Sequence, residues 1–249
     1  MLKGIDVSTL QGTIDWTKVS AEFAMIKATQ GRGEGAATKL LSRFTDSKFK
    51  SNIVNARCPC GVYHYFTATD KQKAINEADY FCSVIEPYRA NIKLWAALDV
   101  ESFYLDGLGK TELTAIVMTA LERIETRGFK PMLYTNPNYL RYRFEPGAFN
   151  DIDIWLAHWG VSKPYFVPNL MIWQYGTTRT DGISTAVDAN YGYFAVETYR
   201  VGNKYTIKPG DRYSNGVSVP ARLIGKSYTI MQVRDGKILL GEISSWVKI

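Results

Sequence analysis

The stretch Leu94-Trp95-Ala96-Ala97-Leu98-Asp99-Val100-Glu101 is an apolar run that ends in two carboxylic acids. Side chains alternate along a β-strand, so Asp99 and Glu101 lie on the same side, about 7 Å apart along the chain. A carboxylic acid that is crowded by another has a raised pKa, which a general acid requires. The stretch therefore predicts a strand with an acid pair at its carboxyl end. The alternative is a strand that ends in two solvated acids, and it is weakened because other strand ends repeat the feature.

Short apolar runs alternate with longer amphipathic segments from residue 4 to about residue 193, which is typical of a sheet whose strands are joined through helices. One helix opens at Asp70, and another covers 110–128, where apolar residues recur at helical spacing and Gly128 is the stop signal. After Thr135 the connections are short or rich in Pro and Gly, so we expect loops there. The expected strands are 4–7, 24–28, 61–66, 94–100, 131–135, 154–158, 170–174 and 186–188.

Eight strands with helices only in the first part predict an α/β fold, an incomplete TIM-like barrel. In such barrels the active site lies at the C-terminal ends of the strands. Asp6 ends the first expected strand and Asp188 ends the last one. Because the first and last strands are neighbours in a closed barrel, we expect these two acids to meet Asp99 and Glu101 at one rim. Four carboxylates would then line one pocket.

Aromatic and amide side chains follow several of the same strand ends. Sugars bind on aromatic faces and to fixed hydrogen-bonding groups, so these side chains are candidates for substrate binding. Core packing is the alternative for any single aromatic residue. The candidate substrate-binding residues are Tyr63, Tyr65, Tyr134, Asn136, Trp159, Trp173 and Gln174.

Taken together, these residues resemble the glycoside hydrolase family 25 lysozymes, N-acetylmuramidases of the Chalaropsis type that occur in fungi, bacteria and phages. The resemblance spans residues 4–195. It departs from the family at Gln30, because family members often have Glu after Ala-Thr. This difference concerns a contact on the substrate side and leaves the catalytic carboxylates unchanged. The markers are Gly4-Ile5-Asp6-Val7-Ser8, Asp15-Trp16, Ile26-Lys27-Ala28-Thr29, Gly61-Val62-Tyr63-His64-Tyr65-Phe66, Leu98-Asp99-Val100-Glu101, Tyr134-Thr135-Asn136, Ile172-Trp173-Gln174-Tyr175-Gly176 and Val187-Asp188-Ala189-Asn190.

The resemblance implies a flattened barrel of five β/α units followed by three strands, (β/α)5(β)3, that cleaves the β-1,4 bond between N-acetylmuramic acid and N-acetylglucosamine in peptidoglycan. Carried over by position, Glu101 is the general acid and Asp99 steadies the charged intermediate. Asp6 and Asp188 complete the acidic site. The resemblance also implies retention of configuration, with either the substrate's acetamido oxygen or a carboxylate as the nucleophile. It implies no cofactor and no metal.

The C-terminal residues differ from the rest in charge and pattern. Residues 201–249 hold eight Lys or Arg against three acids, whereas the remaining 200 residues hold 22 basic and 21 acidic side chains. Short alternating runs, among them 204–207, 221–224, 228–233 and 238–243, are separated by the turns Pro209-Gly210-Asp211 and Asp235-Gly236, which predicts a small all-β barrel. We therefore expect a catalytic domain over 1–199 and a second domain over 200–249.

The second domain looks like the SH3-like wall-binding modules of phage lysins. Its positive charge favours anionic wall polymers such as teichoic acids as partners. Tyr205, Tyr213, Tyr228 and Trp246 are candidate binding faces, and a core role for at least two of them is an equal alternative in so small a barrel.

Composition excludes other classes of protein. Of the 249 residues, 46% are hydrophobic and 13% aromatic, which excludes a disordered chain. No apolar run approaches the roughly 20 residues of a bilayer-spanning helix, so we expect no membrane insertion. The N-terminus lacks the pattern of a secretory signal. We therefore expect a phage endolysin that is made in the host bacterial cytoplasm and acts on the cell wall after release.

Four competing functions remain open at this point. Cys58, Cys60 or Cys82 with His64 or His158 could form a Cys–His hydrolase, although no cysteine is placed at a helix start that would lower its pKa. Metal-dependent cleavage lacks a recognisable ligand set. Nucleic-acid binding by the basic tail is a third possibility, which we do not expect. A wall-binding protein with an inactive barrel is the fourth, and the presence of all four acids disfavours it.

Overall fold

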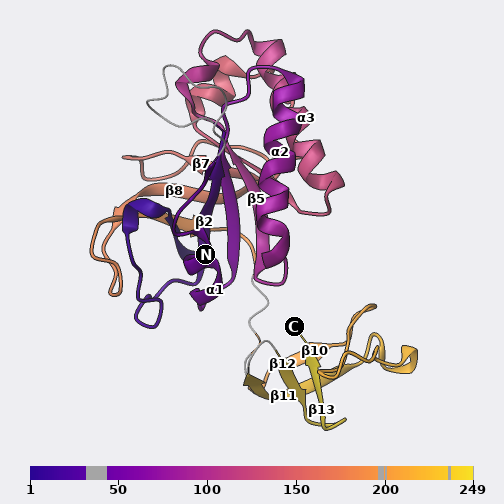
Figure 1. Ribbon diagram of the computed structural model, residues 1–249. Helices are drawn as coiled ribbons and strands as arrows, with labels where there is room; N and C mark the ends of the chain where they lie inside the picture. Colours follow the sequence, from indigo (N-terminus) through magenta and orange to yellow (C-terminus); the bar gives the residue numbers. More distant parts are fainter. Residues whose placement is uncertain (32–43, 196–198, 200, 235–236, 249) are drawn as a thin grey trace. The chain divides into compact units, whose positions relative to one another are not determined.

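The computed structural model describes residues 1–31, 44–195, 199, 201–234 and 237–248. The chain divides into two compact units, Met1–Phe194 and Ala195–Ile249, which we call unit 1 and unit 2 (Figure 1). Each unit has a hydrophobic core of its own. None of the described helices is long and apolar enough to span a bilayer.

Unit 1 is a closed barrel of eight strands. Each strand from β1 through β8 is parallel to its neighbour in the barrel, and β9 closes it by pairing antiparallel with both β8 and β1. The short strand β3 (Phe44–Thr45) pairs antiparallel with β2 outside this ring. The predicted α/β barrel is confirmed. Its strands are β1 (Leu2–Val7), β2 (Phe23–Gln30), β4 (Cys60–Tyr65), β5 (Ile92–Asp99), β6 (Pro131–Thr135), β7 (Ile154–Ala157), β8 (Leu170–Thr178) and β9 (Val187–Gly192).

Three of the connections contain α-helices: α1 (Phe49–Asn55), α2 (Lys71–Ile85) and α3 (Lys110–Thr126). Helix α2 begins where predicted, because the Asp70 side chain accepts a hydrogen bond from Lys73 N at 2.8 Å and caps the first turn. After α3, Gly128 adopts φ +77°, the left-handed conformation that ends a helix.

The expectation of five helical connections needs a correction. The connection from β1 to β2 holds only the 3₁₀ turn η1 (Thr9–Gln11), and the connection from β6 to β7 holds only the π-helical turn η4 (Tyr139–Arg143). Gly12 ends the first of these with φ +66°. In the second, Pro146 and Gly147 (φ +78°) prevent a longer helix. The other 3₁₀ turns among the described residues of unit 1 are η2 (Glu86–Tyr88) and η3 (Phe103–Leu105).

The barrel wall separates two apolar layers. Along β5, Ala96 and Leu98 face the helices, whereas Trp95 and Ala97 face the barrel interior. Period-2 alternation sorts the other strands in the same way. The interior is filled mostly by bulky side chains, so it is a packed core that leaves polar groups only at its ends. Its buried members are Phe23, Met25, Tyr63, Trp95, Ala97, Met132, Tyr134, Trp155 and Ile172.

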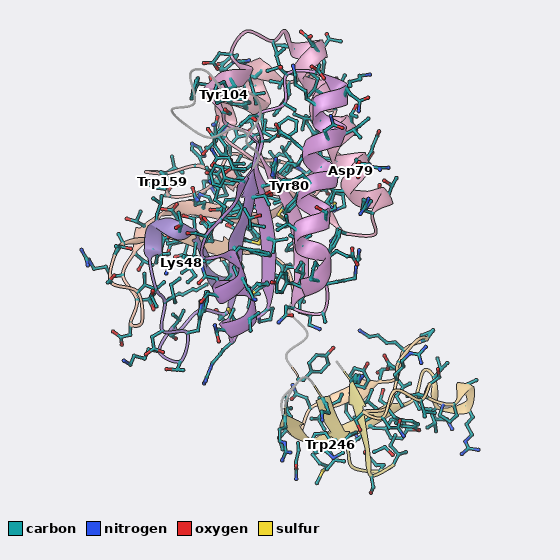
Figure 2. All side chains as sticks on the ribbon, viewed as in Figure 1. Lys48, Asp79, Tyr80, Tyr104, Trp159 and Trp246 are labelled. Atoms are coloured by element: carbon teal, nitrogen blue, oxygen red, sulfur yellow. The ribbon has the colours of Figure 1, made fainter. Side chains whose placement is uncertain are left out.

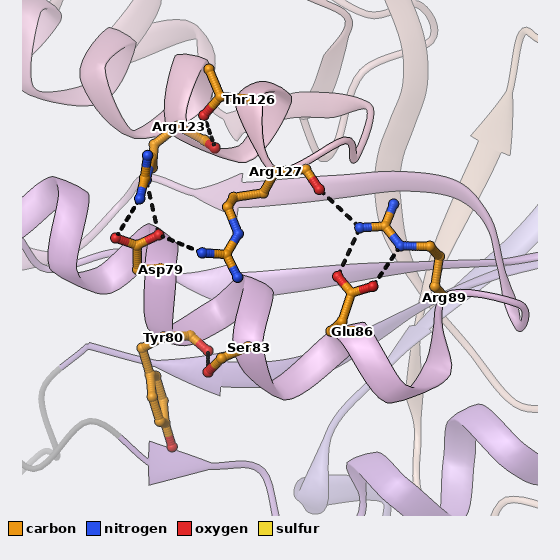
Figure 3. A network of polar contacts seen from close by, with 8 residues as sticks. All are labelled: Asp79, Tyr80, Ser83, Glu86, Arg89, Arg123, Thr126 and Arg127. Atoms are coloured by element: carbon orange, nitrogen blue, oxygen red, sulfur yellow. Dashed lines mark hydrogen bonds and ion pairs between the residues drawn. The ribbon is translucent and has the colours of Figure 1, made fainter.

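Polar contacts join helices α2 and α3 on the outside of the barrel (Figure 3). Asp79 accepts from Arg123 Nε at 2.8 Å and Nη2 at 3.0 Å, and from Arg127 Nη1 at 3.3 Å. Arg89 pairs with Glu86 and donates to the carbonyl oxygens of Arg127 and Gly128 at 2.8 Å each. These groups are exposed to solvent, which screens their charges, so each pair contributes little free energy of folding.

Unit 2 is a four-stranded antiparallel sheet, β10-β11-β12-β13, with a small core of its own. Residues 221–224 do not form the expected strand. They follow Pro220 and begin the 3₁₀ turn η5 (Ala221–Leu223), closed by Ile224 N donating to Ala221 O at 3.1 Å. The expected turn at Asp235-Gly236 lies outside the described residues. The strands are β10 (Lys204–Thr206), β11 (Ser227–Arg234), β12 (Lys237–Leu240) and β13 (Ser245–Lys248).

Candidate active site

Four carboxylic acids lie at the C-terminal end of the parallel strands, as the sequence predicts. Asp6 on β1 and Asp188 on β9 are direct partners in the antiparallel pair, so their side chains leave the same face of the sheet. Asp99 ends β5 and is in register with Tyr65 on β4 and Tyr134 on β6. Asp6 and Asp99 are each 7% exposed, whereas Glu101, two residues beyond Asp99, is exposed at the rim.

Two side-chain amides hold Asp6. Its Oδ2 accepts from Asn190 Nδ2 at 2.7 Å and from Gln174 Nε2 at 3.0 Å. Indole groups orient both amides, because Trp155 Nε1 donates to Asn190 Oδ1 at 2.8 Å and Trp159 Nε1 donates to Gln174 Oε1 at 3.0 Å. The Asp6 carboxyl is therefore fixed by a hydrogen-bonded chain that crosses the barrel interior.

The pKa of Asp6 is raised to about 7. Burial is the largest cause, and the negative charges of Asp188 and Glu101 add to it, while the hydrogen bonds from Asn190 and Gln174 act in the opposite direction. Burial also raises the pKa of Asp188. Close carboxylates that are removed from water cannot all be ionised without a large cost, so this site retains protons towards neutral pH.

The acid pair on β5 has raised pKa values as well. Burial raises the pKa of Asp99 well above its usual range, with a further contribution from the charge of Glu101, whereas Lys27 lowers it. Asp99 Oδ1 is buried with no hydrogen-bond partner among the described residues. Although Glu101 is exposed at the rim, its partial removal from water raises its pKa, a hydrogen bond with Tyr134 lowers it, and the charge of Asp188 raises it. A raised pKa keeps a carboxyl group protonated and able to donate, which a general acid requires.

Lys27 and Asn190 belong to the site, although the sequence analysis did not single them out as site residues. Lys27 Nζ donates to Gln30 Oε1 at 2.9 Å and lies 5.2 Å from the centre of the Tyr65 ring. The signal for Lys27 was present, because it continues the inward-facing alternation of Phe23 and Met25 with a charge. Asn190 follows Asp188 by two residues on β9, and the same alternation could have identified it.

The predicted aromatic residues differ in what they do. Tyr63 and Tyr134 are buried inside the barrel, where each meets the Trp155 ring edge to face at 5.7 Å and 4.6 Å between centroids. Tyr134 still reaches the site, because its hydroxyl donates to Gln174 Oε1 at 3.2 Å. Trp159, on the connection that follows β7 (Figure 2), is 50% exposed and is the predicted aromatic residue best placed to meet a ligand.

Two expected substrate contacts are placed elsewhere. Trp173 lies on the face of β8 opposite to Gln174, where its indole donates to His158 O at 2.8 Å and its ring packs against Tyr175 and Tyr191. Asn136 uses its Oδ1 to accept from Asn138 N at 3.0 Å and Tyr139 N at 3.1 Å, which caps the start of η4.

Both histidines have partners other than cysteine. His64 is fully buried, with Nδ1 2.7 Å from Thr29 Oγ1 and Nε2 3.0 Å from Glu77 Oε2. His158 Nδ1 accepts from Tyr165 N at 2.9 Å. The three cysteines are free thiols, and burial raises the pKa of Cys82 to about 11. A buried thiol that resists ionisation is a poor nucleophile, so the contacts do not support a Cys–His pair.

In unit 2, Tyr205 and Tyr228 are buried in the core, which confirms the core alternative for these two. Trp246 is half-buried and lines a cleft of about 180 Å³ together with Ser214, Arg234 and Lys237 (Figure 2). The pairing of β12 with β13 puts Trp246 and Lys237 on the sheet face opposite the core residues Ile238 and Val247.

An eight-stranded α/β barrel with buried and rim carboxyl groups at one end has the parts needed for acid-assisted cleavage of a glycosidic bond. The family model for glycosyl hydrolases family 25 matches residues 5–183, a range that includes Asp6, Asp99 and Glu101. The chain belongs to glycosyl hydrolase family 25 and is a glycoside hydrolase.

Three similar proteins illustrate the relationship. Lysozyme M1 of Streptomyces globisporus is 31% identical over 209 residues, 76% of this chain and 67% of that protein. The autolytic lysozyme of Clostridium acetobutylicum is 29% identical over 216 residues, 84% of this chain and 60% of its own length. The crystal structure of a bacterial lysozyme from Streptomyces coelicolor superposes with a TM-score of 0.61 at 28% identity, covering 78% of this chain and 93% of that one. This chain thus spans about two thirds of the length of the two curated relatives.

Proposed function

We propose that the protein is a muramidase that hydrolyses the β-1,4 bond between N-acetylmuramic acid and N-acetylglucosamine in bacterial peptidoglycan. The family supplies the class of reaction, and the lysozymes that it resembles supply the class of substrate. One observation carries the proposal most: an exposed acid with a raised pKa, Glu101, stands two residues beyond a buried acid, Asp99, at the barrel end where Asp6 and Asp188 also meet.

In the proposed reaction, Glu101 donates a proton to the glycosidic oxygen as the bond to the leaving sugar breaks. The acetamido oxygen of the substrate attacks the anomeric carbon, and Asp99 stabilises the positive charge that develops. Water then attacks the anomeric carbon and displaces the acetamido oxygen, while Glu101, now ionised, takes a proton from that water. The two successive inversions give retention of configuration. Asp6 and Asp188 border the reacting sugar. The polar and aromatic side chains beside that sugar come from Tyr65, Tyr134, Gln174 and Trp159.

Product analysis tests this proposal. Purified peptidoglycan is digested with the full chain and the new reducing ends are reduced with borohydride. A muramidase yields muramitol in the hydrolysate. Glucosaminitol or new free amino groups would contradict the proposed bond, and NMR detection of the α-anomer as the first-formed product would contradict retention.

We infer further that unit 2 is an SH3-like module that binds anionic wall polymers such as teichoic acids. Its support is the excess of five positive charges over residues 201–249 and the cleft where Trp246 adjoins Arg234 and Lys237. A fusion of residues 195–249 to a fluorescent protein should stain susceptible cells, and staining should fall as salt screens the charges. Lys237→Gln should weaken staining, whereas Lys226→Gln, outside the cleft, should not. If the fusion stained walls stripped of teichoic acid as strongly as untreated walls, teichoic acid would not be its partner.

We propose, finally, that the protein serves as a phage endolysin, made in the host cytoplasm and acting on the wall after release. A basic wall-binding unit joined to a hydrolase barrel suits that role. Cells that express the full chain should remain intact until their membrane is permeabilised and should then lyse rapidly. Lysis during expression without permeabilisation would contradict the proposal.

A further inference from the structure

An exposed aromatic ring, Phe103, and a half-buried one, Tyr104, follow directly after the acid pair. Phe103 is 60% exposed, and its ring centroid lies 4.2 Å from that of Tyr104 with the planes inclined by 32°. Figure 2 labels Tyr104 on this connection, which leads from β5 to α3. At this spacing and tilt the two rings are stacked on one another, so Tyr104 backs one face of the Phe103 ring and the other face of Phe103 is turned to solvent. We call this stacked pair the aromatic step. A large exposed apolar side chain gains no burial energy in the free protein, and an apolar patch beside a catalytic group indicates contact with a ligand.

The turn that carries the aromatic step is anchored in the core. Ser102 and Leu105, on either side of the rings, are fully buried. Ser102 Oγ accepts from Tyr104 N at 3.3 Å, and Leu105 N donates to Ser102 O at 3.0 Å, which closes the 3₁₀ turn η3. The aromatic step therefore lies on a short turn whose backbone has little freedom.

Side chains from the next connection hold the same turn. Arg143 Nη2 donates to Leu105 O at 2.6 Å and to Leu108 O at 3.4 Å, and its Nη1 lies 3.2 Å from Asp106 Oδ1. Tyr139 OH donates to Ser102 O at 3.4 Å. A surface that is held in place before binding costs little entropy to use, so it can contribute more of its contact energy to affinity.

We propose that the aromatic step is a saccharide-binding platform, on which a pyranose ring of the glycan strand stacks next to the bond that Glu101 protonates. The inference rests on the proposed muramidase function. The short chain distance to Glu101 places the bound sugar beside the reacting bond. The apolar ring face favours the C–H face of a pyranose over the peptide stem of peptidoglycan, because a charged group of the peptide would lose water there without gaining a partner.

The test compares steady-state kinetics of the full chain and its Phe103→Ala variant on glycan strands freed of peptides and on intact soluble peptidoglycan. The expected result is a KM that rises roughly tenfold on both substrates, with kcat changed less than about twofold, because the platform binds ground state and transition state alike. Phe103→Trp keeps a flat ring and should have a KM close to that of the unsubstituted enzyme, whereas Phe103→Leu should have a raised KM. Tyr193→Ala is the matched control: this 42% exposed ring follows β9, which runs antiparallel to β1, and so lies at the other end of the barrel.

Each other outcome overturns the inference. An unchanged KM in Phe103→Ala would show that no sugar binds on the aromatic step. A fall in kcat at constant KM would show that Phe103 acts through Glu101. A KM that rises only on peptide-bearing substrate assigns the step to the peptide. Binding of peptide-free glycan to Glu101→Gln, with and without Phe103→Ala, gives a readout apart from activity: equal affinities contradict the platform. If the unsubstituted enzyme releases no muramitol, the proposed function fails, and this binding comparison still decides the platform.

Discussion

Trp155 Nε1 donates a hydrogen bond to Asn190 Oδ1 at 2.8 Å, and this contact fixes which end of the Asn190 amide faces Asp6. An indole nitrogen can only donate, so Asn190 must direct its oxygen towards Trp155 and its nitrogen towards Asp6 Oδ2, 2.7 Å away. Trp159 acts on Gln174 in the same way. Asp6 is therefore surrounded by donors that stabilise its ionised form, which opposes the burial that raises its pKa.

Asn190→Ala should raise the pKa of Asp6 further above its present value of about 7, because one stabilising donor is lost while burial and Asp188 remain. Carbon-13 NMR titration of the aspartate carboxyl groups measures the shift. Asn55→Ala, at an exposed position of α1, is the control and should leave the titration unchanged. A pKa that falls in the Asn190 variant would show that the hydrogen bond stabilises the protonated form.

Glu101→Gln should reduce lytic activity by at least about 10²- to 10⁴-fold, the usual contribution of general acid catalysis. The residue is exposed, so the variant should fold and melt as the unsubstituted protein does. Turbidity clearance of cell walls and circular dichroism measure the two properties. Cys82→Ala should keep most of the activity. Clearance near the original rate by a folded Glu101→Gln variant would remove Glu101 from the role of acid.

Asp99→Asn should lose activity. Its stability relative to the unsubstituted protein should also increase as the pH rises. The pKa of Asp99 is raised in the folded protein. The free energy of unfolding is therefore unaffected by its ionisation below about pH 4, the pKa of an unfolded aspartate. Stability is then lost as the pH rises through the pKa of the folded protein. An amide carries no charge and escapes this loss. The melting temperature of the variant, relative to the original, should therefore increase from pH 4 to pH 8. A difference that stays constant with pH would contradict the raised pKa.

Glu77 and Asp79 are two carboxylates of helix α2 with very different expected costs of removal. Glu77 is buried and accepts from Thr67 N at 3.0 Å and Thr67 Oγ1 at 2.8 Å, besides its contact with His64. Glu77→Ala leaves those groups unpaired in the core and should cost about 2–5 kcal/mol of unfolding free energy. Asp79→Ala breaks the solvent-exposed pairs with Arg123 and Arg127 and should cost much less unfolding free energy than Glu77→Ala. Chemical denaturation measures both, and equal losses would contradict the assignment.

The strands of unit 1 were predictable because each has a strong local pattern. The eight expected apolar runs all became barrel strands, and the expectation that Asp6 would meet Asp188 followed from barrel closure alone. The acid pair was equally clear, since Asp99 and Glu101 alternate with the buried Val100. Local period and simple topology were sufficient for these features.

The errors concern features that local patterns do not determine. The sequence 221–224 alternates as a strand does, yet Pro220 and the closing hydrogen bond of Ile224 make it a 3₁₀ turn. Trp173 and Gln174 are adjacent at one strand end, so only the assignment of inward and outward faces could tell which one enters the site. Lys27 was overlooked although it continues the alternation of Phe23 and Met25, because the alternation alone does not tell which face of β2 points into the barrel.

The closure of the barrel by β9 has a consequence for the timing of synthesis. Asn190 binds Asp6 from 184 residues further along the chain. At about 5–20 residues per second, a ribosome needs roughly 10–40 seconds to travel between them. Contacts between such distant residues also form late in folding, because the chain must first close a long loop. A growing chain therefore carries Asp99 and Glu101 well before it can hold Asp6 in place, and we expect the enzyme to be inert until its last barrel strand has been made.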